Sequence, residues 1–242
     1  MSSVTTHVIF DLDGTLINTM DTMAKQIAIY ANSFGKTVSP DLINNIITSP
    51  NSQPYYNEFM NQIHGPGAPR IPDPNEFEES ILDQTYESPD LALIPGVNRL
   101  VQHLYRHNIP MAIASGGIGR HYESLLLNKN FGNYFEEGLH FSHVVMGWDD
   151  PDVVRNKPAP DVYYVCAKRF RTQPPLSYDN VLIVEDSLIG ITGALATGLM
   201  KTLLVNDQKR TNFKGLTDRI TCIANSFDDF RPESVGLPPY YD

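Results

Sequence analysis

Short apolar runs alternate with amphipathic stretches along most of this chain. Residues 7–11 (HVIFD) form an apolar run that stops at an acidic turn, which predicts a short buried strand. The expected strands are residues 7–11, 109–115, 140–146, 180–185 and 200–205, and the expected helices between the later strands include 96–107, 159–170 and 187–197. Strands that alternate with helices predict an α/β fold, a doubly wound and mostly parallel sheet with helices on both faces.

Residues 16–93 depart from this alternation. Apolar residues at three- and four-residue spacing predict a helix over 19–34, and Ser39-Pro40-Asp41 is typical of a second helix start. Residues 49–75 contain six prolines and two glycines, so loops between short helices are expected there. Residues 76–86 again have a helical pattern.

The chain is therefore expected to form two domains. The core comprises residues 1–15 and 94–242, and a mainly helical domain, residues 16–93, is inserted after the first strand. In doubly wound sheets, ligand sites lie beyond the carboxyl ends of the strands. Candidate chemistry is thus expected where the strands of the core end.

Polar residues follow four of the expected strands. They are Asp11-Leu12-Asp13-Gly14-Thr15, Ser115-Gly116, Lys157-Pro158 in the loop after the third strand, and Glu185-Asp186. Each group alone has an ordinary structural explanation, since Asp-Leu-Asp-Gly is a common turn and Glu185-Asp186 suits the start of a helix. Their joint occurrence, in this order and at strand ends, indicates a functional site.

These residues resemble the motifs of the haloacid dehalogenase superfamily. DLDGTL matches its first motif, Ser115 its second, Lys157 its third and Glu185-Asp186 its fourth. The resemblance implies a Rossmann-like core and an enzyme of phosphoryl transfer. It also implies that the insert forms a small helical cap domain, which closes over the substrate.

The resemblance also implies a role for each residue. Asp11 would attack phosphorus and form an aspartyl-phosphate, which splits one difficult step into two. Asp13 would protonate the leaving oxygen and then take a proton from the attacking water. Ser115, Gly116 and Lys157 would bind the phosphoryl oxygens.

Four acidic residues near a phosphate need a cation. Two like charges at about 4 Å repel by about 4 kcal/mol at an effective dielectric constant of about 20. A hard cation with oxygen ligands offsets this repulsion, and Mg²⁺ suits such a site best. The resemblance implies Asp11, the Asp13 carbonyl and Asp186 as direct ligands, with Glu185 acting through water.

The second half of the chain resembles the pseudouridine-5′-phosphatase branch more closely. The matching segments are SHVVMGWDDPDVVRNKPAPDVYYVCAKRF, VLIVEDSLIGI and FRPESVGLPPYYD. Two positions depart from that branch: residues 46–59 of the insert carry no basic residue where the branch has Gly-Lys or Gly-Arg, and Ile189 replaces an Asn. Both departures concern the choice of substrate more than the core chemistry.

The expected function is therefore that of a Mg²⁺-dependent phosphomonoesterase acting through an aspartyl-phosphate. Its expected substrate is a small phosphorylated metabolite such as pseudouridine 5′-phosphate or a related nucleotide or sugar phosphate. Two alternatives stay open, a phosphomutase of the β-phosphoglucomutase type and a catalytically silent binding protein. By resemblance, Asp13 favours phosphatases and mutases over dehalogenases, which lack this second acid.

Charge and composition limit the other classes. The chain has 28 acidic and 18 basic residues, a net charge of −10, which argues against a nucleic-acid partner. No basic segment followed by an apolar run begins the sequence, and no apolar stretch reaches the roughly 18 residues that span a bilayer. We expect a cytoplasmic monomer without a membrane partner.

Cysteine and histidine spacing predicts no further metal site. Cys166 and Cys222 lie far apart and outside any CxxC pattern, so free thiols are expected. His103 and His107 are four residues apart, but no Glu follows His103. They are interpreted as exposed helix residues and not as zinc ligands.

Overall fold

The computed structural model describes residues 4–49, 51–65, 72–205, 213 and 215–240. Within these residues, the core contains one parallel sheet of six strands in the order β3-β2-β1-β4-β5-β6. The strands are β1 His7–Phe10, β2 Met111–Ser115, β3 Val144–Met146, β4 Val181–Glu185, β5 Lys201–Val205 and β6 Cys222–Ala224. The expected fold class, a doubly wound parallel sheet, is confirmed.

The strand order reverses at β1. This strand pairs with β2 on one side, where Ile9 aligns with Ala112, and with β4 on the other, where Ile9 aligns with Ile183. The connection from β1 thus leads to one half of the sheet, and later strands build the other half. Such a switch point leaves a crevice at the carboxyl ends of the strands, which is where ligands bind in this architecture.

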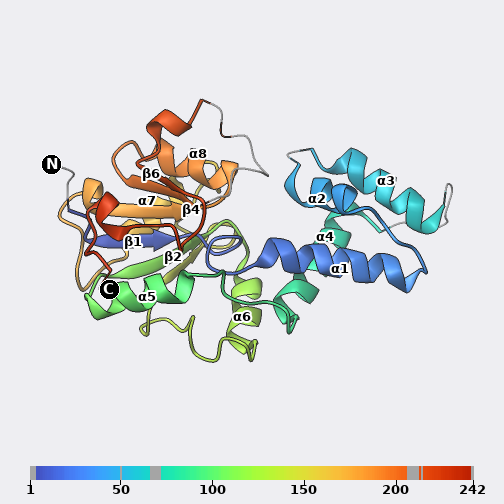
Figure 1. Cartoon of the computed structure of the whole chain (residues 1–242), viewed down its shortest axis with the longest axis horizontal. Helices are drawn as coiled ribbons and strands as arrows, with labels where there is room; N and C mark the ends of the chain where they lie inside the picture. Colours follow the sequence, from blue (N-terminus) through green and yellow to red (C-terminus); the bar gives the residue numbers. More distant parts are fainter. Residues whose placement is uncertain (1–3, 50, 66–71, 206–212, 214, 241–242) are drawn as a thin grey trace.

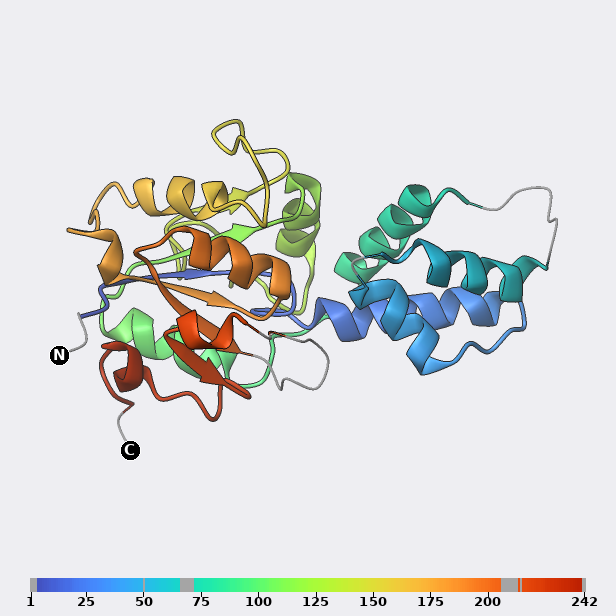
Figure 2. The ribbon, with the colours of Figure 1, turned by 90° about the horizontal axis from the view of Figure 1, so that it is seen from above.

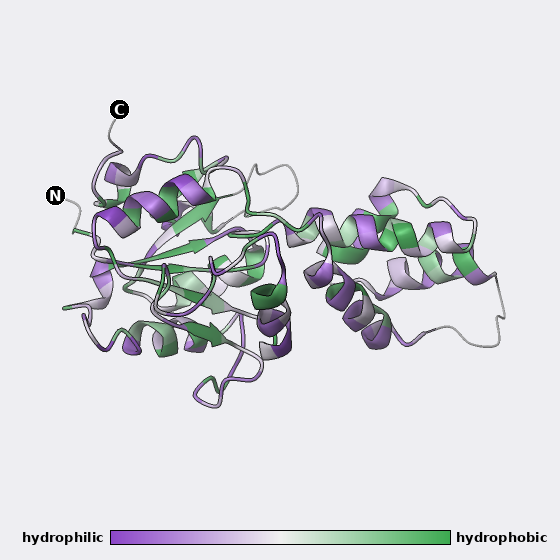
Figure 3. Cartoon of the chain, turned by 90° about the horizontal axis from the view of Figure 1, so that it is seen from below, coloured by the Kyte–Doolittle hydropathy of each residue, from purple (hydrophilic) through white to green (hydrophobic). Residues whose placement is uncertain are grey.

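Helices cover both faces of the sheet. They are α5 Val97–Arg106, α6 Gly119–Leu127, α7 Asp161–Lys168 and α8 Leu188–Ala196, with short 3-10 helices at Tyr178–Asn180, Thr217–Arg219 and Pro232–Val235. Side chains of β1 alternate between the faces, so Val8 and Phe10 belong to the cluster of α5, while Ile9 belongs to that of α7. The apolar colouring along the strands in Figure 3 reflects this burial on both sides.

Four helices form a separate helical unit, residues 19–87. They are α1 Thr19–Ser33, α2 Pro40–Thr48, α3 Gln53–His64 and α4 Pro74–Glu87. Ile27, Phe59 and Ile81 belong to an apolar cluster made only by this unit. Figures 1 and 2 show the unit beyond one end of the sheet, joined to the core by two segments.

The two segments that join the helical unit to the core pair with each other. Ile17 forms an antiparallel bridge with Leu93, and the amide of Asn18 donates to Ala92 O at 3.0 Å. The Asn18 side chain accepts from the amide of Ala92 at 2.7 Å. The insert therefore begins and ends at neighbouring points of the core.

Residues 49–75 were expected to form loops between short helices, and helix α3 lies within this stretch. At 12 residues it is longer than the short helices expected. Its proline, Pro54, stands in the first turn, where the missing amide would have no partner inside the helix. Residues 66–71 of the same stretch lie outside the described residues.

Two expectations are wrong. The sequence predicts no strand after residue 205, yet β6 adds an edge strand, whose three residues are too few to produce a recognisable pattern. His103 is buried, not exposed, and its Nε2 lies 2.9 Å from Pro238 O. In the described part of the chain, no helix has both the length and the apolar character needed to cross a membrane.

Candidate active site

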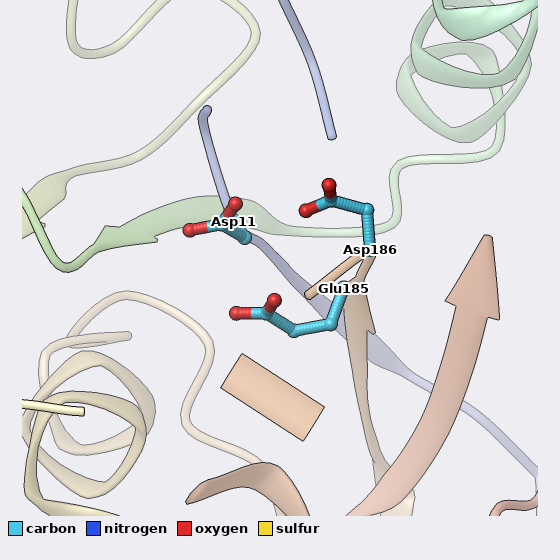
Figure 4. A group of neighbouring side chains, drawn as sticks. All are labelled: Asp11, Glu185 and Asp186. Carbon is cyan, nitrogen blue, oxygen red and sulfur yellow. The ribbon is translucent and has the colours of Figure 1, made fainter. Parts of the chain in front are cut away.

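The predicted site residues meet at the carboxyl ends of the central strands. Asp11 follows β1, Ser115 ends β2, Glu185 ends β4 and Asp186 follows it. Lys157 reaches the same place from the loop between β3 and α7. Figure 4 shows the carboxylates of Asp11, Glu185 and Asp186 gathered at this edge of the sheet.

Lys157 joins two of these carboxylates. Its Nζ lies 2.6 Å from Asp11 Oδ1 and 2.6 Å from Glu185 Oε1. The side chains of Lys157 and Asp11 are 7% and 8% exposed, and that of Glu185 is fully buried. Screening by water is weak at such a site, so the ion pairs strongly fix the relative positions of the three groups.

The acidic cluster has the composition of a site for a hard cation. Asp11, Glu185 and Asp186 each offer a carboxylate oxygen, and these oxygens all lie within 4.8 Å of one another. Thr15 Oγ1 donates to Asp186 Oδ1 at 3.0 Å and orients that carboxylate. All donors are oxygen atoms, which fits Mg²⁺ or Ca²⁺ and not a thiolate-loving metal.

The charges of the cluster are unbalanced without a cation. Burial, and next the carboxylate of Glu185, raises the pKa of Asp11 to about 7. Burial and the nearby Asp11 raise the pKa of Asp186 well above its ordinary value. Burial alone would lower the pKa of Lys157, but the carboxylates of Asp11 and Glu185 outweigh burial and raise it. One ammonium group therefore faces more negative charge than it can offset.

Two glycines make room for these carboxylates. Gly14 has φ = +79°, and a Cβ atom at this position would overlap the carboxylate of Asp186. Gly190, in the first turn of α8, lies against Glu185, and a Cβ atom there would overlap both oxygens of that carboxylate. The close approach of backbone to carboxylate explains why the turn after β1 and the start of α8 contain glycine.

Tyr163 of α7 also contacts Glu185 and was not predicted as a site residue. Its hydroxyl donates to Glu185 Oε1 at 2.6 Å and lies 3.0 Å from Gly190 O. Ser187 Oγ donates to the second oxygen, Oε2, at 3.2 Å. Together with Lys157, these donors satisfy the buried carboxylate and hold it in one orientation.

Asp13 stands beside the cluster, between Ser115 and the helical unit. Tyr86 of α4 donates its phenol hydrogen to Asp13 Oδ1 at 2.5 Å, and Ser115 Oγ donates to Oδ2 at 3.4 Å. Burial, and next the charge of Asp13, raises the pKa of Tyr86 well above its ordinary value. The amide of Gly117 donates to Ser115 Oγ at 3.0 Å, which fixes the serine hydroxyl.

Asn156 connects the second and third predicted motifs. Its Nδ2 donates to Gly116 O at 2.8 Å, and its Oδ1 accepts from the amide of Lys157 at 2.8 Å. Neither Asn156 nor Tyr86 was predicted from the sequence, because each acts through a contact with a residue far away along the chain. Gly116 is thus held beside Lys157, as the predicted phosphate-binding set requires.

The known relatives identify the family. The family model of haloacid dehalogenase-like hydrolases matches residues 8–205. The chain belongs to this family. The family suggested by DLDGTL, Ser115, Lys157 and Glu185-Asp186 is thereby confirmed, and with it the expectation of a hydrolase.

Two curated relatives in this family cover nearly the whole chain. (DL)-glycerol-3-phosphatase 2 of Arabidopsis thaliana is 32% identical over 240 residues, which cover 98% of this chain and 93% of that protein. A probable pseudouridine-5′-phosphatase of Drosophila melanogaster is 29% identical over 241 residues, with 98% and 96% covered. Both names denote phosphatases of small molecules, in agreement with the expected phosphoric monoester hydrolase.

A solved structure supports the fold independently. The crystal structure of a conserved haloacid dehalogenase-like protein from Agrobacterium tumefaciens superimposes with a TM-score of 0.65. The match covers 93% of this chain and 95% of that one at 24% identity. The combination of a parallel-sheet core with an inserted helical unit therefore occurs in another protein of this fold.

Proposed function

We propose that this chain is a Mg²⁺-dependent phosphomonoesterase that transfers the phosphoryl group of a small metabolite first to Asp11 and then to water. The observation that carries the proposal is the buried group of Asp11, Glu185 and Asp186 around Lys157, at the switch point of the sheet. The names of the two phosphatase relatives support the same reaction class.

In the first step, Asp11 is the nucleophile. Lys157 binds its Oδ1, so the second carboxylate oxygen is the one that forms the bond to phosphorus. Ser115 Oγ, the amide of Gly116 and the Lys157 ammonium bind the phosphoryl oxygens and stabilise the charge that develops on them. Asp13 gives its proton to the leaving oxygen as the bond from phosphorus to that oxygen breaks.

In the second step, water releases the phosphate. Asp13, now ionised, takes a proton from a water molecule as that water attacks the phosphorus of the aspartyl-phosphate. The bond between phosphorus and Asp11 breaks, and the carboxylate of Asp11 and the proton of Asp13 are both restored. The enzyme returns to its starting state with an alcohol and inorganic phosphate as products.

Mg²⁺ fits the donor set. Asp11, Asp186 and the main-chain carbonyl of Asp13 would hold it directly, with Glu185 as an outer ligand. When bound, it offsets the negative charge of the carboxylates and the phosphate, so that the two can approach. Lys157, 2.6 Å from Asp11 Oδ1, supplies a further positive charge.

The chain is further proposed to consist of a core, residues 1–15 and 94–242, and a cap, residues 16–93. The separate apolar cluster of the helical unit and its place beyond the catalytic end of the sheet support this division. Closure of the cap would exclude water from the leaving group during the first step. Localisation in the cytoplasm and a monomeric state remain predictions.

The substrate class follows from the relatives and the cap. Glycerol and pseudouridine, the alcohols in the relatives' names, are both uncharged and rich in hydroxyl groups. The cap segment of residues 46–59 contains no basic residue that would select a second anionic group. The proposed substrate is thus the phosphate monoester of a neutral polyhydroxylated alcohol, with pseudouridine 5′-phosphate and glycerol 3-phosphate as first candidates.

Phosphate release from a panel of monoesters tests the proposal. The panel holds pseudouridine 5′-phosphate, glycerol 3-phosphate, nucleoside monophosphates and sugar phosphates, each with Mg²⁺ and with a chelator. Release should require Mg²⁺, vanish in Asp11→Asn and persist in Asp218→Asn, an exposed aspartate used as the matched control. A folded protein that releases phosphate from no compound would refute the proposal. Interconversion of sugar phosphates that depends on a bisphosphate would reveal a mutase instead.

A further inference from the structure

The side chain of Tyr86 distinguishes the two oxygens of Asp13. Oδ1 accepts the phenol hydrogen at 2.5 Å, whereas Oδ2 lies 3.4 Å from Ser115 Oγ at the end of β2. Oδ1 carries no hydrogen, whether Asp13 is ionised or holds its proton on Oδ2, so the phenol supplies the hydrogen of this contact. One oxygen of Asp13 is therefore bound to α4, and the other faces the residue proposed to bind phosphate.

Tyr86 itself is fixed to the core from two directions. It is 1% exposed, and the imidazole of His121 on α6 stacks on its ring at 4.9 Å with an angle of 10° between the planes. Asp83 Oδ1, one turn earlier on α4, lies 3.3 Å from His121 Nε2. Asn128 Nδ2 donates to the main-chain oxygen of Tyr86 at 2.8 Å.

The ring also belongs to the apolar cluster of the core and not to that of the helical unit. Tyr86 is thus a residue of the inserted sequence whose side chain is anchored on the core. Its hydroxyl has a defined position relative to Asp13, as a group that orients a catalytic side chain must have.

We infer that Tyr86 is a positioning residue of the reaction, which holds Asp13 with Oδ2 turned toward Ser115 and the phosphate. The inference rests on the proposed function, in which Asp13 is the acid and base. The terminal torsion of an aspartate is broad, so a carboxyl group without a donor on Oδ1 can turn either oxygen toward the substrate. The phenol removes this freedom before the substrate arrives.

The contact matters most when the leaving oxygen needs a proton. In the first step, phosphorus bonds to Asp11 while the leaving oxygen takes both the electron pair of its broken bond and the proton on Asp13 Oδ2. Tyr86 keeps its own proton and donates to Oδ1 throughout. An alkyl phosphate releases an alkoxide, which needs this proton as it leaves. An aryl phosphate such as p-nitrophenyl phosphate releases p-nitrophenolate, which is stable as an anion near neutral pH and needs the proton far less.

The test compares kcat/KM of Tyr86→Phe and wild type on an alkyl and an aryl phosphate, both with saturating Mg²⁺. With glycerol 3-phosphate, or pseudouridine 5′-phosphate if that is the better substrate, we expect a loss of about 10- to 100-fold. With p-nitrophenyl phosphate we expect a loss below about threefold, because general-acid assistance contributes little there. Since kcat/KM reports only the steps up to alcohol release, slow hydrolysis of the intermediate does not enter this ratio.

Tyr122→Phe is the matched control. Tyr122 lies next to His121 on α6 and donates its phenol hydrogen to Phe135 O at 2.7 Å, a contact within the core. Loss of this hydroxyl should change kcat/KM by the same factor for both substrates. If Tyr86→Phe also changes both substrates equally, or changes neither, Tyr86 is only a structural residue and the inference is wrong.

Two additional measurements keep the inference testable if Tyr86→Phe folds poorly. His121→Leu removes the imidazole that stacks on the Tyr86 ring. It should lower kcat/KM less than Tyr86→Phe does, and again more for the alkyl than for the aryl phosphate. An equal loss of kcat/KM on both substrates would overturn the inference. In the Asp13→Asn background, Tyr86→Phe should leave the ratio of the two substrates unchanged. A wild-type protein that releases phosphate from no compound of the panel refutes the proposed function, and the role of Tyr86 with it; an active wild type separates the two questions.

Discussion

The ammonium group of Lys157 lies 2.6 Å from Glu185 Oε1, the same oxygen that accepts the hydroxyl of Tyr163. Glu185 has no exposed surface, so both contacts act without competition from water. A buried carboxylate with such partners is stable only while those partners remain. The geometry of the acidic cluster therefore depends on Lys157 as much as on the acids.

Replacing Lys157 by Met should abolish most activity and weaken the fold. We expect kcat to fall by about 10²- to 10³-fold, because the phosphoryl oxygens lose a charged donor. We also expect the free energy of unfolding, measured without metal, to fall by about 3–5 kcal/mol, since two buried carboxylates lose the ammonium group that pairs with them. Steady-state kinetics and urea denaturation measure the two effects. The exposed Lys168→Met is the control, and a Lys157→Met protein that keeps a tenth of wild-type activity would contradict the assignment.

Gly190→Ala should weaken metal binding. The new methyl group overlaps the carboxylate of Glu185 and must displace it, while alanine itself is the better helix former. Changes next to metal ligands typically lower metal affinity by about 10- to 100-fold, and the same range is expected here for Mg²⁺. The Mg²⁺ dependence of activity measures the shift. Ile189 is exposed on the same helical turn, so Ile189→Ala should keep the wild-type Mg²⁺ dependence. A wild-type Mg²⁺ dependence in Gly190→Ala would disprove the role of Glu185.

Arg169 should support the loop that presents Lys157. Its guanidinium binds both oxygens of Asp150 at 2.5 and 2.7 Å and also Asp152 at 2.7 Å, in the loop between β3 and α7. Lysine cannot make this two-point contact, so Arg169→Lys should let the loop move. We expect kcat to fall by about tenfold, given how strongly rates depend on small misplacements. The exposed Arg171→Lys serves as control, and equal kcat values for the two variants would count against this role.

Two buried histidines should contribute less to the stability of the fold in mild acid than at neutral pH. His7 and His143 both pack against Phe170, with ring distances of 4.7 and 4.9 Å, and burial lowers the pKa of each below the ordinary 6.5. On these two histidines, the unfolded chain therefore takes up protons near pH 6.5 that the folded chain does not. Their contribution to the free energy of unfolding is complete above that pH and is lost as the pH is lowered through it, whereas Asp11 and Asp186, whose pKa values are raised, contribute in the opposite direction.

Urea midpoints at pH 7.5, 6.5 and 5.5 measure this trend. Comparison with His143→Gln isolates one histidine, because both proteins share the same carboxylates. Relative to the midpoint of His143→Gln, the wild-type midpoint should decrease toward pH 5.5. His64→Gln, in the helical unit, is the control and should follow the wild type. A wild-type midpoint that rises toward pH 5.5 relative to that of His143→Gln would show that His143 is protonated more readily in the folded state.

Much of the site was predictable because a parallel sheet brings the carboxyl ends of its strands together. Asp11, Ser115 and Glu185 end neighbouring strands, so their proximity follows from strand order alone. Tyr86 could not be predicted in this way. It follows Asp13 by 73 residues, and only the packing of α4 on α6 brings its phenol to the carboxylate.

The errors in the fold have equally local causes. The length of helix α3 was underestimated because Pro54 was counted as a helix breaker, although it stands in the first turn where proline is favoured. Tyr163 lies in an apolar helical pattern, and nothing in its neighbourhood along the chain shows that its hydroxyl reaches Glu185. Burial of His103 depends on the segment around Pro238, which folds back from the far end of the sequence.

Because Ile17 pairs with Leu93, the inserted sequence leaves and re-enters the core at a single point. A segment of different length or shape can be exchanged at such a point without re-routing any strand, so evolution can alter substrate preference while the catalytic half is inherited unchanged. Tyr86 limits that independence, since it lies within the exchangeable segment yet contacts Asp13. A descendant that acquires a new cap must therefore keep a hydroxyl at this position or find another donor for the same carboxylate.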